Sequence, residues 1–256
     1  MLQAHSPLWH YLWVAPNVLT LLLAAFLWRR GLHKKYPAFV AFLVIASIEQ
    51  LTIYTADITP SIDARTWWMI FWAGLILEGL IKFTVISEIF ANIFDSYSSI
   101  ASLGKLSIRG FGVLLVLAGA VAAGYAPQDS RFGIVTGAHL LQQTIYLIES
   151  GLLVFIFALA GYFRLRPPRA VVGISMGLGI SACVHLATWG LATNAGLGER
   201  AFAILDIVNM LIYHFCVLLW FYYLLVPGKV VAKSTVPLPD NNLDVWNREL
   251  ERLLQP

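Results

Sequence analysis

The chain has 256 residues, of which 59% are hydrophobic and 12% charged, and its mean hydropathy is +0.75. Water-soluble globular domains carry about 25% charged residues, so this composition indicates a membrane protein and excludes a soluble catalytic or nucleic-acid-binding domain. A helix rises about 1.5 Å per residue and needs roughly 20 residues to cross the hydrocarbon core. A chain of this length therefore holds about seven spans joined by short loops. The net charge of +3 is too mild to indicate an acidic partner.

Long apolar runs, interrupted by proline, glycine and charge, predict an all-α polytopic membrane protein with seven transmembrane helices. We expect the first run to be a retained helix, because no basic segment or small-residue cleavage site of a signal peptide accompanies it. The predicted spans are Leu8–Leu27, Pro37–Thr55, Thr66–Phe94, Gly110–Tyr125, Gly133–Phe163, Ala170–Ala192 and Arg200–Val226.

The distribution of basic residues predicts the orientation of these spans. Loops rich in lysine and arginine stay in the cytoplasm, and eleven basic residues lie after the odd-numbered spans, against three in the opposite loops (Arg65, Arg131 and Arg200). The N-terminus is therefore expected outside and the C-terminus inside, in the cytoplasm. The eleven are Arg29, Arg30, Lys34, Lys35, Lys105, Arg109, Arg164, Arg166, Arg169, Lys229 and Lys233.

Polar and ionisable side chains occur within five of the predicted spans. Such residues are unfavourable in lipid and usually face the bundle interior, so each is a candidate functional residue. Further acids lie at Glu49, next to Gln50, and at Glu88, which is expected to reach the interface or meet a basic loop residue such as Arg109. The predicted ligand-binding residues are Glu78, Lys82, His139, Gln142, Tyr146, Glu149, His185, Asp206, Asn209 and Tyr213.

Two spacings relate members of this set. Glu78 and Lys82 are four residues apart with the acid first, which favours an ion pair along one helix face. The sequence leaves open whether that pair only tolerates burial or also contacts a ligand. Gln142, Tyr146 and Glu149 follow His139 at helical spacing, and this polar stripe must face protein or water. Asp206, Asn209 and Tyr213 repeat the pattern in the last span.

The sequence supports no particular cofactor. His139, His185 and Asp206 fall at similar depth and are weak candidates for a metal site, but no local motif joins them. A hydrogen-bond network or a small-molecule pocket are the alternatives. Cys183 and Cys216 lie inside spans and are interpreted as small apolar residues.

Aromatic and small residues near the span ends suggest structural roles. Trp67, Trp68 and Trp72 at one end, and Trp220, Tyr222 and Tyr223 at the other, are interpreted as anchors at the membrane interfaces. Small residues in the sixth span predict close helix packing; they are Gly173, Ser175, Gly177, Gly179 and Ser181.

The sequence divides into a seven-helix bundle over residues 1–228, a linker over 229–242 with two prolines, and a short amphipathic helix over 243–256. The mixed charge of this helix favours docking on protein over binding anionic lipid. The expected docking residues are Leu243, Trp246, Leu250 and Leu253. We expect no effector module after this helix, so a receptor of this form would pass its signal to another polypeptide.

Three motifs carry a resemblance over essentially the whole chain: RRGLHKKYP at residues 29–37, VISEIF at 85–90 and VWN at 245–247. The sequence resembles a group of bacterial seven-helix integral membrane proteins without an assigned activity, so the resemblance implies a fold and no function. In topology alone it is similar to the seven-helix sensor regions that precede bacterial histidine kinases, and to heptahelical receptors.

Two other seven-helix classes fit the residues poorly. The predicted last span has no lysine for a retinal Schiff base. Zinc hydrolases of lipid amides keep histidines four residues apart on the last helix, whereas His214 is flanked at that spacing by Met210 and Leu218.

We therefore expect a non-enzymatic membrane protein that binds a small molecule or lipid in a polar interior. It would act as a sensor, or as an accessory subunit of a membrane complex, through its cytoplasmic loops and tail. The alternatives are a proton-coupled transporter, suggested by Glu49, Glu78, Glu149 and Asp206, and a membrane-embedded metallohydrolase using His139, His185 and Asp206. The expected partners are the lipid bilayer and another protein, and no nucleic acid.

Overall fold

The computed structural model describes residues 6–94, 110, 131–165, 167–194 and 199–226, and no strand occurs in this part of the chain. Side chains at 131–139, 192–200 and 202 are outside the description. The chain divides into two units, Met1–Val226 and Pro227–Pro256. The predicted linker and the tail residues Leu243, Trp246, Leu250 and Leu253 all fall in the second unit, outside the described residues.

Six of the predicted spans are confirmed as helices that are long and apolar enough to cross a membrane. The predicted fourth span, Gly110–Tyr125, lies outside the described residues except for Gly110. The helices are α1 (Pro7–Arg29), α2 (Pro37–Ile58), α3 (Ala64–Phe94), α5 (Arg131–Tyr162), α6 (Arg169–Asn194) and α7 (Glu199–Leu225), with a short 3-10 turn η1 (Leu32–Lys34).

Local sequence explains where the first helices begin and end. The Ser6 hydroxyl accepts from the Trp9 amide (3.3 Å) and caps α1, and Pro7 and Pro37 occupy first-turn positions where a missing N–H is harmless. Gly31 has φ +71°, a left-handed conformation that glycine adopts without strain, and it turns the chain from α1 into η1.

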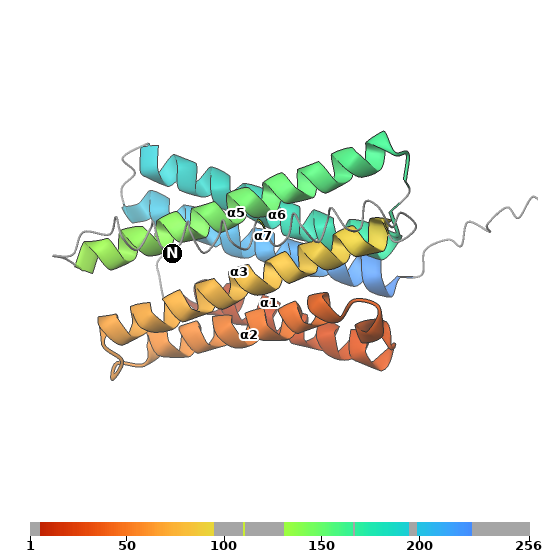
Figure 1. The fold of residues 1–256 in the computed structure, drawn as a ribbon. Helices are drawn as coiled ribbons and strands as arrows, with labels where there is room; N and C mark the ends of the chain where they lie inside the picture. Colours follow the sequence, from red (N-terminus) through yellow and green to blue (C-terminus); the bar gives the residue numbers. More distant parts are fainter. Residues whose placement is uncertain (1–5, 95–109, 111–130, 166, 195–198, 227–256) are drawn as a thin grey trace, which may run out of the picture. The chain divides into compact units, whose positions relative to one another are not determined.

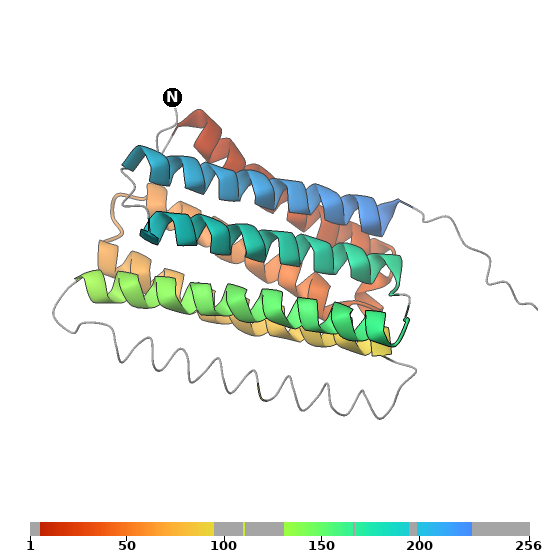
Figure 2. The same cartoon turned by 90° about the horizontal axis from the view of Figure 1, so that it is seen from above.

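The described helices of the first unit form a closed ring. Each helix contacts its neighbours in the order α1, α2, α3, α5, α6, α7, and α1 packs against α7 to close it (Figure 2). The Arg30 guanidinium donates to the Leu225 carbonyl (2.9 Å) and thereby joins the ends of α1 and α7. The ring gives every described helix an inward face.

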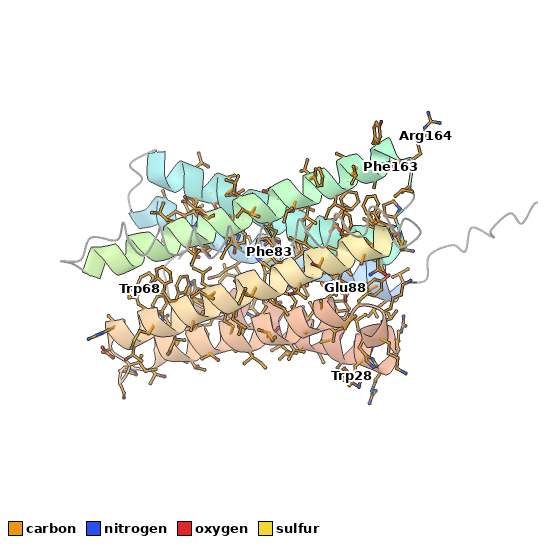
Figure 3. All side chains as sticks on the ribbon, in the orientation of Figure 1. Trp28, Trp68, Phe83, Glu88, Phe163 and Arg164 are labelled. Atoms are coloured by element: carbon orange, nitrogen blue, oxygen red, sulfur yellow. The ribbon has the colours of Figure 1, made fainter. Side chains whose placement is uncertain are left out.

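The two ends of the ring differ in charge. The end at which α1, α3, α5 and α7 finish and α2 and α6 begin is called the basic end here; among the described residues it carries Arg29, Arg30, Lys34, Lys35, Arg164 and Arg169 (Figure 1). Trp28, Glu88 and Arg164 lie at this end and Trp68 at the opposite end (Figure 3).

The half of the ring nearer the basic end has a solid apolar core. Its largest fully buried side chains include Trp220, Phe39, Phe94 and Leu27, supplied by four different helices. Burying side chains of this size is the main favourable contribution to helix packing in this half.

The interpretation of Trp220 as an interfacial anchor is wrong. Its side chain is 1% exposed, its indole N–H donates to the Ile174 carbonyl (3.3 Å), and its ring packs edge-on against Phe39 and Phe42. Tyr222, two residues later, is exposed. The difference arises because residues two apart on a helix point to different faces.

The predicted small-residue surface of α6 does allow close packing at two positions. A Cβ at Gly177 would overlap the Trp220 indole, and a Cβ at Gly173 would overlap the Tyr223 side chain. Glycine at these positions lets α6 and α7 approach closely, as in other membrane helix pairs.

Glu88 holds the beginning of α2. Its two carboxylate oxygens accept from the backbone amides of Ala38 (2.9 Å) and Phe39 (3.0 Å), while the cap residue Tyr36 makes no side-chain capping bond. Burial, with a contribution from the Glu88 carboxylate, raises the pKa of the Tyr36 phenol. Glu88 is therefore a helix cap supplied from α3, a role that the sequence did not predict.

The substitution Gly177→Ala is expected to destabilise the protein by about 1–3 kcal/mol, because the added methyl group displaces the Trp220 ring. The free energy of unfolding in detergent micelles measures the effect. Gly151→Ala is the control, since a Cβ there meets nothing within 4 Å. Equal stability of the two variants would contradict the packing described for α6 and α7.

The substitution Glu88→Ala is expected to lower the free energy of unfolding by about 1–2 kcal/mol, because it leaves two amides of α2 without an acceptor. Glu88→Gln keeps one acceptor oxygen and should fall between Glu88→Ala and the unmodified protein. If the glutamine and alanine variants unfold alike, capping is not the role of this side chain.

Candidate functional site

A polar cavity occupies the half of the ring farther from the basic end. Its volume is about 240 Å³, far more than the roughly 10–15 Å³ that one ordered water requires. All six described helices contribute to its wall, and Trp220 and Phe42 of the apolar core border it. The polar lining residues are Asn17, Glu49, Gln50, Glu78, Lys82, Gln142, Tyr146, Glu149, Ser181, His185, Asp206, Asn209 and Tyr213.

The structure brings nine of the ten predicted ligand-binding residues together at this cavity. The stripe formed by Gln142, Tyr146 and Glu149 lies in the wall contributed by α5, and Asp206, Asn209 and Tyr213 lie in the wall contributed by α7. The tenth residue, His139, belongs to α5, but its side chain is outside the described residues.

Lys82 is the centre of the charged part of the wall. Its ammonium nitrogen lies 2.8 Å from Glu78 Oε1, as the four-residue spacing predicts, and 3.2 Å from Glu149 Oε2 on α5. The same nitrogen lies 4.4 Å from the centre of the Tyr146 ring. Lys82 and Glu149 are both buried. One ammonium group thus faces two carboxylates and an aromatic ring, an arrangement that offsets the desolvation of a buried cation.

His185 extends this cluster toward α6. Its ring lies 4.6 Å from the Tyr146 ring, centre to centre, and its Nδ1 is 3.3 Å from the Ser181 carbonyl, to which it donates. In the neutral ring this bond leaves Nε2 as an acceptor. His185 can therefore take a proton or a hydrogen bond from a group in the cavity.

Asp206 lies at the edge of the cavity. It is an exposed residue that also lines the cavity, so the cavity reaches the surface of the bundle at this position. The Trp9 indole N–H donates to Asp206 Oδ2 (3.4 Å). One helical turn further into the bundle, Asn209 Oδ1 accepts from the Thr188 hydroxyl (3.1 Å). The entrance thus combines a carboxylate with an aromatic side chain.

Sequence reasoning missed parts of the wall. Glu49 was noted as an intramembrane acid but not placed in the site, and Trp13 and Asn17 of α1 were not considered. Trp67, interpreted as an anchor, also lines the cavity. Asn17 did offer a signal, since an amide within an otherwise apolar span usually faces protein.

Gly74 lets α2 approach α3 at the level of Glu49. A Cβ at this glycine would overlap the Glu49 side chain, so the absence of a side chain makes room for the carboxylate beside α3. The pattern of glycine opposite an acid is invisible in either helix alone.

The described side chains include no group of three or more His, Cys, Asp or Glu residues arranged to hold a metal ion. The proposed set of His139, His185 and Asp206 depends on a side chain outside that description. Cys183 is exposed and Cys216 is buried, and both are free.

Comparison with known proteins identifies no relative: no protein-family model, no curated protein and no solved structure matches the chain. The geometry of the cavity is therefore the basis for a functional proposal.

The substitution Lys82→Met is expected to lower the free energy of unfolding by about 3–5 kcal/mol, because it leaves the buried Glu149 carboxylate and the half-buried Glu78 carboxylate without a cation. Adding Glu78→Gln and Glu149→Gln should recover much of that loss, since the neutral triple variant buries no unpaired charge. Thermal and chemical unfolding in micelles measures both. Additive losses in the triple variant would contradict the ion-pair description.

Proposed function

We propose that this protein binds a small molecule in the polar cavity and acts as a membrane sensor or as a subunit of a membrane complex. The supporting observation is that polar groups from all six described helices converge on one cavity. A ligand bound there contacts every described helix, so it can favour one arrangement of the ring over another. The compact volume favours a small molecule over a lipid.

The proposed setting is a bacterial cytoplasmic membrane, crossed seven times, with the N-terminus outside. Neighbouring helices α3 and α5 run in the same direction (Figures 1 and 2), so α3 ends at the basic end and α5 begins at the opposite end. This parallel arrangement, and the concentration of basic residues at one end, support seven spans and a cytoplasmic basic end. The cavity then opens toward the outside.

In this proposal, the output is passed at the basic end to another polypeptide. The loops at that end are a proposed docking surface for a protein partner, and Leu243, Trp246, Leu250 and Leu253 of the tail are proposed separately as docking residues. The apolar core between cavity and basic end supports this route, because a well-packed core moves as discrete units.

A proton-coupled transporter is the second candidate. Four carboxyl groups line the cavity (Glu49, Glu78, Glu149 and Asp206), and intramembrane acids often carry protons. Substrate-dependent proton flux in proteoliposomes, measured with and without a pH gradient, would favour this candidate over a sensor.

Native mass spectrometry of the protein, extracted gently from its own membrane, is expected to detect a stoichiometric small-molecule adduct. The substitution Ser181→Phe fills the cavity from α6 and should remove the adduct, whereas Cys183→Phe, two residues later on the exposed face, should retain it. An adduct that persists in the Ser181→Phe variant would place the ligand elsewhere. A protein without any adduct would count against the proposal.

A further inference from the structure

The cavity wall contains polar atoms that find no hydrogen-bond partner within the described part of the chain. Three side chains offer such unpaired acceptors: Asn17 Oδ1, Glu49 Oε2 and Glu149 Oε1. One offers an unpaired donor, the Trp67 indole N–H. A buried polar atom without a partner is unfavourable by about 1–3 kcal/mol, so these four groups together predict the polar groups of an occupant.

Two of these acceptors belong to side chains whose other polar atom is already engaged. The Asn17 amide nitrogen donates to the Trp13 carbonyl (2.7 Å), so the amide oxygen of Asn17 is the atom that lacks a partner. Asn17 is 2% exposed. Glu149 is 1% exposed, and only its other oxygen, Oε2, faces Lys82. The occupant must therefore supply more hydrogen-bond donors than acceptors.

The charge of the wall also favours an occupant that donates hydrogen bonds. The lining residues include four carboxyl groups and one ammonium group, and that ammonium, on Lys82, already faces Glu78 and Glu149 at 2.8 and 3.2 Å. An anionic occupant would find no uncommitted cation among these residues. A cationic occupant would meet carboxylate oxygens that lack a partner, and such charge-assisted hydrogen bonds are the stronger kind.

Aromatic side chains complete the environment. Trp13, Trp67 and Phe71 also line the cavity, and Trp67 and Phe71 are stacked with their ring centres 5.4 Å apart. Aromatic faces attract cations and pack against apolar groups.

We propose that the cavity selects a small organic cation: a primary ammonium held by Glu49, Glu149 and Asn17, with an apolar body against the aromatic wall. A primary ammonium has three donors and no acceptor, which matches three acceptor side chains. This inference rests on the proposed function and specifies the chemical class of its ligand.

The test uses the full-length protein in lipid nanodiscs and two matched probe sets, measured by calorimetry and thermal unfolding. The first set is 2-phenylethylammonium, 2-phenylethanol and 3-phenylpropionate, and the second has cyclohexyl in place of phenyl. Each ammonium is expected to bind at least about tenfold more tightly than its alcohol, because charge-assisted bonds replace neutral ones, and each carboxylate should bind more weakly still.

Two isosteric variants test the assigned contacts. Glu49→Gln and Glu149→Gln should each weaken ammonium binding by about tenfold, since each removes a charged acceptor. Asp57→Asn is the matched control: Asp57 is an exposed acid of the same helix as Glu49 and does not line the cavity. Size-exclusion profiles and unfolding temperatures establish that each variant is folded.

The outcomes separate this inference from the proposed function. If the alcohol and the ammonium bind equally and Ser181→Phe abolishes the binding of both, the ligand is not selected as a cation. The cavity then remains a small-molecule site. Preference for the carboxylate, or ammonium binding that both glutamine variants retain, also overturns the class. If no probe binds, the cation inference fails, and the native adduct decides separately whether the proposed function survives.

Discussion

A single buried ammonium group ties together two helices that no short loop connects. Lys82 on α3 faces Glu78 one turn earlier and Glu149 on α5, and α3 and α5 run side by side in the same direction. In a low-dielectric interior none of these three charges is tolerable alone. Their mutual neutralisation keeps a polar surface inside the ring, and the remaining polar residues of α5, α6 and α7 gather around it.

The ring consequently has two unlike halves. Near the basic end, large apolar side chains such as Trp220 and Phe39 fill the space between the helices. In the other half, polar side chains surround a cavity that reaches the surface at Asp206. In the proposed function, the well-packed half would carry the effect of cavity occupancy to the far end.

Sequence reasoning succeeded where the signal is local to one helix. The bounds of six spans follow from apolar runs, and the Glu78–Lys82 pair follows from a spacing of four. It failed where the signal depends on the rotation of a helix against its neighbours. Trp220 was assigned to the membrane interface but is buried, and the capping of α2 by Glu88 was not predicted.

The sequence by itself determined that this is a helical membrane protein with an unusual number of polar residues inside its spans. The reason is that the length and hydrophobicity of each segment, compared with the thickness of the bilayer, determine whether it can cross. Only the tertiary structure decided which of those residues meet. The order of helices around the ring makes Glu149 the second partner of Lys82. The same order brings Asn17, Glu49 and Trp67 into one cavity wall. Packing between distant segments sets that order, and no spacing within one helix records it.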